Sequence, residues 1–215
     1  MGKLTDTTPK SMLPIAGKPI LEYKLEALPD DVDEVILVVS YLGSVIQKHF
    51  GGLSNGKRIL YVEQETLKGT ADALWLAKDL LKGKFLVMNG DDIYSKEDTE
   101  RCMKHAWTIL VHEGDAKRAG GRVVVDKSHH VTAIEEGAHH GEGKILVNTG
   151  LYFLDERIFN YSPLPKEKGS DELGLPQTMM QAVKDVPIEV VKATQWIQIT
   201  APGDLKKAEE ILAKK

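Results

Sequence analysis

The sequence has a single cysteine and no excess of positive charge. Cys102 alone excludes an intrachain disulfide and a cysteine-rich zinc site. It lies at helical spacing among Thr99, Met103 and Ala106, which favours a buried structural thiol over a nucleophile. The net charge is −4 and no long block of either sign occurs, so the basic patch of a nucleic-acid-binding protein is not supported.

Long apolar runs are also missing. The longest compact one, Val35 to Val39, has the length of a strand and is too short to span a membrane. The residues that follow Met1 lack the hydrophobic core of a signal peptide, which predicts a cytoplasmic protein with no membrane partner. Hydrophobic residues make up 42% of the chain and charged residues 28%, which are globular values. We therefore expect a single domain, residues 1–215, with a sizeable core.

Two carboxylates follow a short apolar run in the middle of the chain. Phe85 to Met88 predicts a strand buried on both faces, and Gly90 ends it directly before Asp91 and Asp92. Because ligands collect at the carboxyl ends of strands in an open parallel sheet, these carboxylates lie where a site is expected. Their hard oxygens suit Mg²⁺ brought by a phosphorylated substrate. Glycine and aspartate are also ordinary turn residues, so a strand-to-helix turn explains the same letters.

Helical and strand patterns alternate over the first half of the chain and then change character. Helices are predicted near residues 19–28, 43–50, 69–81 and 95–106, and strands at 33–40, 58–63 and 84–91. This alternation predicts parallel strands with crossover helices. Strands at 108–111, 122–126, 131–135 and 145–154 predict an antiparallel portion, and a helix at 175–183, strands at 188–192 and 195–199, and a helix from residue 202 follow. The predicted class is α/β, a Rossmann-like three-layer α/β/α arrangement with a mixed, mostly parallel sheet.

Several short segments carry a family signature in order along almost the whole chain. They are the polar opening Leu4 to Ile20, Gln64 with Leu67 to Ala71, Asn89-Gly90-Asp91, Ile134-Glu135-Glu136, Asn148 to Tyr152, and Trp196 to Leu205. Together they resemble motifs of the sugar-1-phosphate nucleotidylyltransferases. Those enzymes join a nucleoside triphosphate to a sugar 1-phosphate and release pyrophosphate, so the resemblance implies these two substrates and Mg²⁺ as cofactor.

The resemblance also implies roles for individual residues. Lys10 would neutralise charge at the transferring phosphate, and Asp91 would anchor Mg²⁺ there, so both are expected to be catalytic. The implied substrate-binding residues lie on the base side (Gln64, Gly69, Thr70) and on the sugar side (Glu136, Asn148, Thr149). Gln64 would hydrogen-bond the base, and Gly69 would allow a close backbone approach.

Structural roles remain open for three of these residues. Lys10 is also explained as a solvated loop lysine, and Gln64 as the cap of a strand end, because both residue types are mostly exposed. Asn148 lies inside an apolar strand and needs hydrogen-bond partners, which a structural network supplies as well as a ligand does.

The chain departs from the family pattern at three places. The first strand and the Gly-rich loop that precede the Leu-Thr segment in the family are not in this sequence, and such a loop offers N–H groups to triphosphate oxygens. Gly137 stands where the family has a phosphate-binding lysine, and Gln198 where it has a second metal-binding aspartate. We therefore expect nucleotidyl transfer to be weak or absent. A non-catalytic nucleotide- or sugar-phosphate-binding relative and a truncated or engineered folding variant are the alternatives, so enzymatic activity stays open.

The first strand of this family lies at the centre of the parallel sheet. Without it, ladder groups on both neighbouring strands lose their partners, which is costly in a protein interior. We expect the neighbours to close up, or another segment or a second chain to fill the slot, for instance in a homodimer that exchanges strands. The sequence itself does not identify the base or the sugar.

Overall fold

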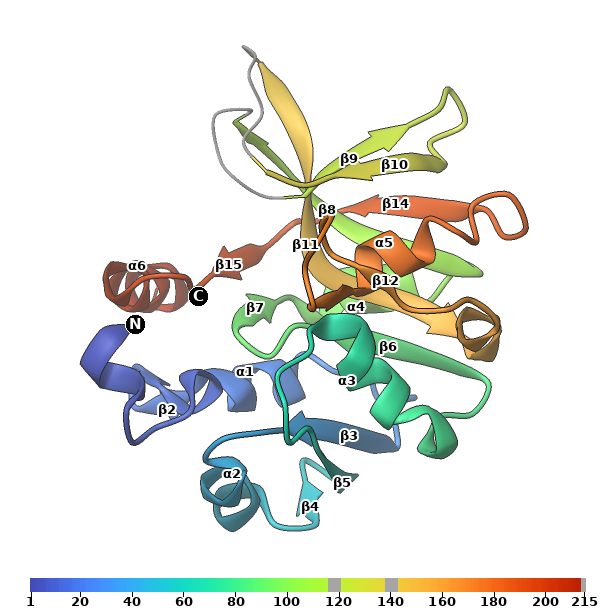
Figure 1. The fold of residues 1–215 in the computed structure, drawn as a ribbon. Helices are drawn as coiled ribbons and strands as arrows, with labels where there is room; N and C mark the ends of the chain where they lie inside the picture. Colours follow the sequence, from blue (N-terminus) through green and yellow to red (C-terminus); the bar gives the residue numbers. More distant parts are fainter. Residues whose placement is uncertain (116–120, 138–142, 214–215) are drawn as a thin grey trace. The chain divides into compact units, whose positions relative to one another are not determined.

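The computed structural model describes residues 1–115, 121–137 and 143–213 and divides the chain into two compact units. The first unit contains Met1–Thr66, Asn89–Thr99 and Gln195–Lys215. The second contains Leu67–Met88 and Glu100–Thr194. Each unit therefore draws on segments that are far apart in the sequence (Figure 1).

The described residues of the first unit form a small sheet, two short antiparallel pairs and three helices. Its strands are β1 (Pro14–Ile15), β2 (Lys18–Pro19), β3 (Glu34–Val39), β4 (Leu53–Ser54), β5 (Lys57–Glu63), β7 (Asp92–Tyr94) and β15 (Trp196–Gln198). Its helices are α1 (Ile20–Glu26), α2 (Gly43–Phe50) and α6 (Pro202–Leu212), with 3-10 turns at Gly2–Thr5 and Lys10–Met12. β3 pairs in parallel with β5, β4 pairs antiparallel with β5, and β15 pairs antiparallel with β7.

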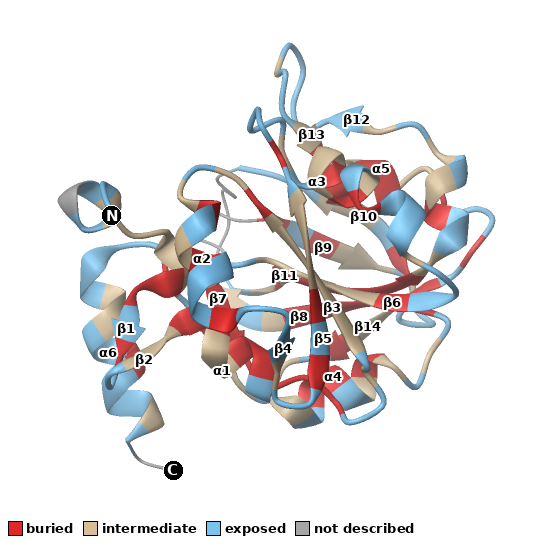
Figure 2. Ribbon diagram, turned by 90° about the horizontal axis from the view of Figure 1, so that it is seen from below, coloured by how far each residue is buried: buried red, intermediate tan, exposed pale blue. Residues whose placement is uncertain are grey.

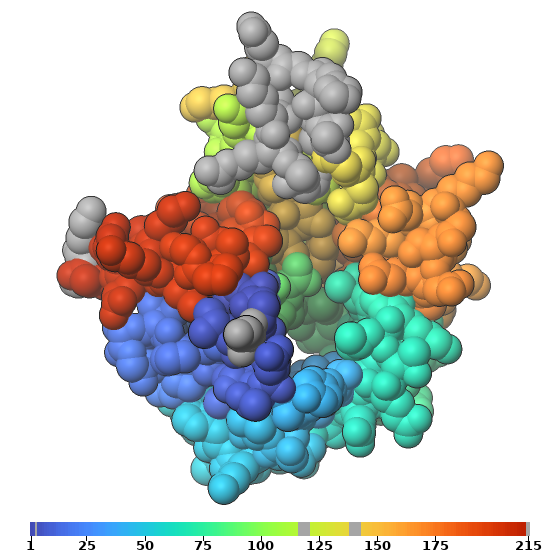
Figure 3. All heavy atoms as spheres, turned by 60° about the vertical axis from the view of Figure 1, so that its left-hand side comes forward, coloured from blue at the N-terminus to red at the C-terminus, as the bar shows by residue number. Residues whose placement is uncertain are grey.

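The core of the first unit joins the two ends of the chain. Ile15 and Ile20 from the amino-terminal segment pack with Ile197, Ile199 and Ala208 from the carboxyl-terminal segment. Figure 3 shows the carboxyl-terminal segment in red against the amino-terminal segment in blue. This packing fixes the β15–β7 pair, and with it the turn that precedes β7.

The second unit is built on one larger mixed sheet and one short antiparallel pair. The strands of the larger sheet are β6 (Lys84–Met88), β8 (Trp107–Asp115), β9 (Arg122–Val125), β10 (Val131–Glu135), β11 (Lys144–Asp155) and β14 (Ile188–Lys192), and β12 (Leu164–Pro165) pairs with β13 (Leu173–Gly174). Its helices are α3 (Thr70–Leu76) and α5 (Leu175–Met179), with 3-10 turns at Lys78–Leu80 and Glu156–Asn160, and α4 (Lys96–Cys102) runs from the first unit into the second.

Strands β8 and β11 form the centre of this sheet. The strand order is β10-β9-β11-β8-β14, and β6 pairs with the carboxyl-terminal half of β11. Residues 107–111 of β8 are all buried, as are residues 149–154 of β11. Figure 2 shows red, buried stretches along both strands. Consecutive burial means that both faces of the sheet are covered here.

The α/β class, the mixed sheet and the antiparallel portion after Trp107 are confirmed. The predicted excess of parallel pairs needs correction, because β3–β5 and β8–β14 are the parallel pairs among the described residues and all others there are antiparallel. β6, expected in a parallel sheet, pairs with the oppositely directed β11, and of its residues Phe85 alone is buried. Helix–strand alternation predicts crossovers, but it does not determine which strands become neighbours.

An unpaired strand edge, the feature expected beside a missing strand, is found on β3 in the first unit and on β6 in the second. Within the described ranges, β3 pairs with β5 alone and β6 with β11 alone, so each strand has one edge without a paired strand. A second segment or chain at these edges stays a prediction, as does the single domain. Across the described part of the chain, every helix falls short of the length and hydrophobicity that a membrane-spanning segment needs.

Candidate functional site

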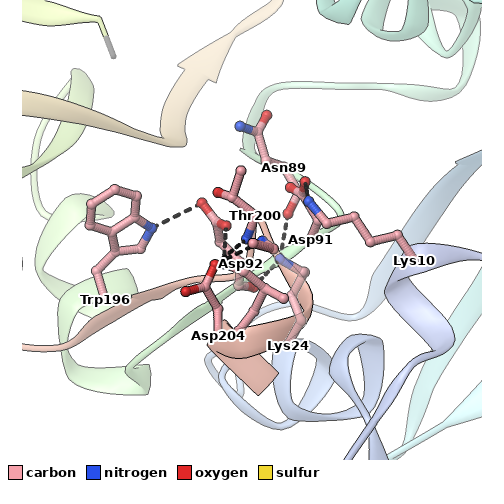
Figure 4. Close-up of polar contacts among 10 residues, drawn as sticks. Lys10, Lys24, Asn89, Asp91, Asp92, Trp196, Thr200 and Asp204 are labelled. Atoms are coloured by element: carbon pink, nitrogen blue, oxygen red, sulfur yellow. Dashed lines mark hydrogen bonds and ion pairs between the residues drawn. The ribbon is translucent and has the colours of Figure 1, made fainter. Parts of the chain in front are cut away.

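The candidate site in the first unit is the turn between residues 89 and 92, directly before β7. Lys10, in the 3-10 turn that follows Pro9, donates from Nζ to Oδ2 of Asp91 at 2.6 Å (Figure 4). The side chains of Lys10 and Asp91 are 29% and 40% exposed. The structure thus brings together the two residues predicted to be catalytic, and it leaves both accessible to a ligand.

Asp92, the neighbour of Asp91, has a different environment. Only 5% of the residue is exposed. Its Oδ2 accepts from Nε1 of Trp196 at 3.0 Å and its Oδ1 from the backbone N–H of Ile199 at 3.3 Å. Burial and the nearby charge of Asp91 raise the pKa of Asp92 to about 6, although the Trp196 and Ile199 donors oppose the rise. Asp92 therefore anchors the turn to β15, while Asp91 remains at the surface.

Lys24 lies beneath the same turn and was not identified from the sequence. Its Nζ donates to the backbone carbonyls of Asn89 and Asp92, and it lies 4.7 Å from the ring centroid of Tyr94. Burial lowers the pKa of Lys24 to about 8, and the charges of Asp92 and Asp91 oppose this. The sequence did contain one sign that Lys24 is buried, because this lysine lies within the stripe of apolar residues that α1 buries.

Asp91 is the side chain at this turn that could serve as a ligand for a metal ion. The described residues contain no group of three or more histidine, cysteine or acidic side chains able to hold a metal ion. Gln198 is exposed and lies opposite Asp92 in the β15–β7 pair, where the family pattern led us to expect a carboxylate. One accessible carboxylate fits a hard cation that keeps waters and phosphate oxygens as its other ligands. It does not fit a cage made of protein ligands alone.

Gln64 also belongs to the first unit. It follows β5, is 7% exposed, and its backbone N–H donates to the carbonyl of Val39 at 2.7 Å. This main-chain bond extends the β3–β5 pairing by one residue. A role of its side chain toward a base stays a prediction.

Gly69 and Thr70 begin α3 in the second unit and contact the segment around β13. Gly69 has φ +92° and ψ −177°, and a Cβ there would lie 2.4 Å from the carbonyl oxygen of Leu173. Thr70 accepts from the backbone N–H of Leu175 through Oγ1 at 3.0 Å. The fold alone therefore explains a glycine at position 69 and a threonine at position 70. Base binding by this segment stays a prediction.

Asn148, Thr149 and Gly150 build an irregularity in β11. The register against β8 shifts between Asn148 and Tyr152, and Gly150 has φ +76°. Asn148 accepts from the N–H of Gly150 at 2.9 Å and donates to the hydroxyl of Tyr152 at 2.8 Å. Thr149 is 1% exposed and donates to the carbonyl of Leu110. The structural network considered for Asn148 is therefore present, and contact of these residues with a sugar stays a prediction.

Glu136 provides an exposed carboxylate near this irregularity. A Cβ on Gly121 would lie 3.1 Å from Oε1 of Glu136 and 3.4 Å from Cβ of Asn148, which puts the two predicted sugar-side residues around one glycine. Nε2 of Gln177 lies 3.4 Å from the same Glu136 oxygen. Burial raises the pKa of the Tyr152 hydroxyl, and the charge of Glu136 adds to this rise. Gln177 is a further polar neighbour that sequence reasoning missed.

The predicted residues thus form two groups: Lys10, Gln64 and Asp91 lie in the first unit, and Gly69, Thr70, Glu136, Asn148 and Thr149 lie in the second. A cavity of about 380 Å³ in the first unit, lined by Tyr23, Glu26, Tyr94 and Leu212 among others, contains none of them.

Comparisons with known proteins agree on one family. Residues 2–215 match the family model described as "Nucleotidyl transferase". The chain is 32% identical to the bifunctional protein GlmU of Methanocaldococcus jannaschii over 213 residues, which cover 99% of this chain and 51% of that protein. It is 33% identical over 168 residues to the D-glycero-alpha-D-manno-heptose 1-phosphate guanylyltransferase of Campylobacter jejuni, covering 76% of this chain and 74% of that one.

A solved structure shows the same fold. The crystal structure of HddC from Yersinia pseudotuberculosis matches with a TM-score of 0.72 and 25% identity, and the match covers 96% of this chain and 91% of that chain. Against the GlmU relative, in contrast, the chain spans about half of the length, 51%.

Proposed function

Since this chain belongs to the sugar-1-phosphate nucleotidyltransferase family, we propose that it transfers a nucleotidyl group from a nucleoside triphosphate to a sugar 1-phosphate. In this reaction a phosphate oxygen of the sugar 1-phosphate forms a bond to the α-phosphorus of the triphosphate. The bond from that phosphorus to the β-phosphate oxygen breaks, and pyrophosphate leaves. The chemistry requires positioning and charge stabilisation, without a covalent enzyme intermediate.

One observation supports this proposal above the others: Lys10 and Asp91 are 2.6 Å apart and partly exposed, next to the turn that begins β7. Lys10 supplies positive charge for the oxygens around the α-phosphorus. Asp91 supplies a hard oxygen for a divalent ion, which enzymes of this family generally use. We propose Mg²⁺ as that ion, and when bound it would neutralise charge on the triphosphate.

Pyrophosphate release tests the proposal directly. Wild-type protein is assayed with Mg²⁺ and a panel of nucleoside triphosphates and sugar 1-phosphates, because the sequence does not fix either substrate. Lys10→Met and Asp91→Asn are each expected to lower turnover about 10²–10³-fold, the usual effect of removing one preorganised charge-stabilising group.

The chain offers a matched control for these variants. Lys18 and Glu26 form a second ion pair in the first unit, also 2.6 Å long, with side-chain exposures of 28% and 46%. Lys18→Met is expected to leave turnover unchanged. An equal loss in Lys18→Met and Lys10→Met would contradict the assigned role, and absence of pyrophosphate release from wild type with every substrate pair would contradict the activity itself.

Binding without turnover is the second candidate, and the observation that favours it is Gln198. This amide lies opposite Asp92 where the family pattern has a metal-binding carboxylate, and an amide is a weaker Mg²⁺ ligand. Such a protein would be stabilised by a nucleoside triphosphate but would release no pyrophosphate. A ligand at 100 times its Kd stabilises the folded state by about 2.7 kcal/mol, which a thermal shift detects.

A further inference from the structure

Lys24 is a charged side chain that the core of the first unit encloses. It is 5% exposed and lies on the buried face of α1 with Ile20, Leu21 and Leu25. Enclosing an ammonium group is costly unless hydrogen bonds satisfy it. Here Nζ donates to two backbone carbonyls and lies over the face of Tyr94. An apolar side chain would fill the core without the free-energy cost of burying a charge, so core packing alone does not explain a lysine at this position.

The position of the two carbonyls gives Lys24 a specific effect. They belong to Asn89 and Asp92, the residues on either side of Gly90 and Asp91, so one ammonium group holds both ends of the turn (Figure 4). The side chain of Asp92 is held separately by Trp196 and Ile199. Asp91 therefore has a partly exposed carboxylate, in a turn whose two ends are both fixed by Lys24.

Charge adds to this geometry. Asp91 and Asp92 are adjacent in sequence, and their negative charges interact with each other as well as with Lys24. A buried positive charge under the turn offsets that repulsion where the dielectric constant is low. Removal of the ammonium group would take one hydrogen-bond donor from each of the two carbonyls, and it would take a nearby positive charge from the two carboxylates. Both changes would displace Asp91.

We propose that Lys24 is a positioning residue, which holds the Asn89–Asp92 turn so that the Asp91 carboxylate meets a divalent cation on the triphosphate. This inference depends on the proposed function, because it assigns Lys24 to the same nucleotidyl-transfer site. Lys24 itself touches neither the cation nor the substrate. It acts through the backbone of the turn.

Lys57 is a matched control for this proposal. It is also a buried lysine of the first unit, 8% exposed, and its Nζ also donates to two backbone carbonyls, those of Pro29 and Val32, at 2.8 and 2.6 Å. Those carbonyls follow α1 and do not belong to the turn around Asp91. Lys24→Met and Lys57→Met each remove one ammonium group and keep an unbranched side chain, so both are expected to lower the unfolding temperature.

The readout that separates the two variants is cation binding, measured with Mn²⁺ by electron paramagnetic resonance in the presence of UTP or GTP. Lys24→Met is expected to weaken Mn²⁺ binding about 10–100-fold, the usual effect of losing a residue that orients a metal ligand. Lys57→Met is expected to bind Mn²⁺ as wild type does. Amide hydrogen exchange of residues 89–92 is expected to become faster in Lys24→Met alone. If Lys24→Met does not fold, Lys24→Gln, which keeps one donor group, replaces it, with a smaller shift in the same direction.

Equal Mn²⁺ binding by wild type and the Lys24 variant would overturn the proposal, even if turnover fell. A wild type that binds Mn²⁺ in a Lys24-dependent way but releases no pyrophosphate would overturn the proposed activity and support the positioning role. If the wild type releases pyrophosphate but its Mn²⁺ binding does not depend on Lys24, the proposed activity is supported and the positioning role is overturned. Absence of any Mn²⁺ binding would remove the ion that Lys24 is proposed to serve, and so would also overturn the proposal.

Discussion

Replacing Gly69 with alanine is expected to destabilise the second unit by about 3 kcal/mol, and the structure allows the terms to be separated. At φ +92° and ψ −177°, Gly69 occupies a backbone region that is essentially restricted to glycine, and another residue there costs about 1–3 kcal/mol. The new Cβ would lie 2.4 Å from the carbonyl oxygen and 2.8 Å from the nitrogen of Leu173. Backbone atoms cannot turn away as a side chain does, so Leu173 must move.

Moving Leu173 disturbs a second interaction. Its N–H donates to the carbonyl of Lys68 at 2.7 Å, a bond whose loss costs about 0.5–1.5 kcal/mol. Gly83→Ala is the control, because Gly83 lies in the same unit at φ +63° and a Cβ there would meet no atom within 4 Å. Only the cost of a positive φ applies to it, about 1–2 kcal/mol.

Urea unfolding followed by tryptophan fluorescence measures this difference. A Trp196→Phe background restricts the signal to Trp75 and Trp107, which both belong to the second unit. Equal destabilisation by Gly69→Ala and Gly83→Ala would refute the argument that contact with Leu173 requires the glycine. If Gly69→Ala instead kept its stability and lost nucleotide affinity, the base-side role expected from the sequence would be favoured.

Two further predictions concern the ends of helices. The N–H groups of Ala201 and Thr200 lower the pKa of Asp204, so its carboxylate stabilises the fold above the ordinary aspartate pKa and this contribution is lost as the pH falls through the lowered value. Asp204→Asn is expected to lower the free energy of unfolding by about 1 kcal/mol at neutral pH and by progressively less in acid. Thermal unfolding of wild type and variant at a series of pH values measures this, and a stability difference that does not depend on pH would contradict it. Cys102, 0% exposed, is expected to react with a thiol reagent only as fast as the protein unfolds, and rapid labelling in native buffer would show that the thiol is accessible.

Local pattern was sufficient for most elements of this chain. Apolar residues three and four apart predicted the helix that the structure shows at Ile20–Glu26, and the apolar run after Asp33 predicted the strand Glu34–Val39. The polar opening and the Asn-Gly-Asp segment indicated Lys10 and Asp91, which lie 2.6 Å apart. The helix predicted from residue 95 begins at Lys96, and the hydroxyl of Ser95 accepts from the N–H of Asp98 in its first turn.

The contacts that define the site could not be predicted in the same way. Lys24 and the turn at 89–92 are more than 60 residues apart, with separations of 65 and 68 residues for its two hydrogen bonds. Gly69 is close to Leu173, and Asp92 to Trp196, across similar or larger gaps in the sequence. The sequence by itself determined where the chain turns and which residues face a core, because propensity and periodicity act over a few residues. It also determined which family the chain resembles, because the motifs that carry the resemblance are short segments of sequence. Only the tertiary structure decided which strands pair and which buried lysine holds which carbonyls, because those partners are chosen by packing between distant segments.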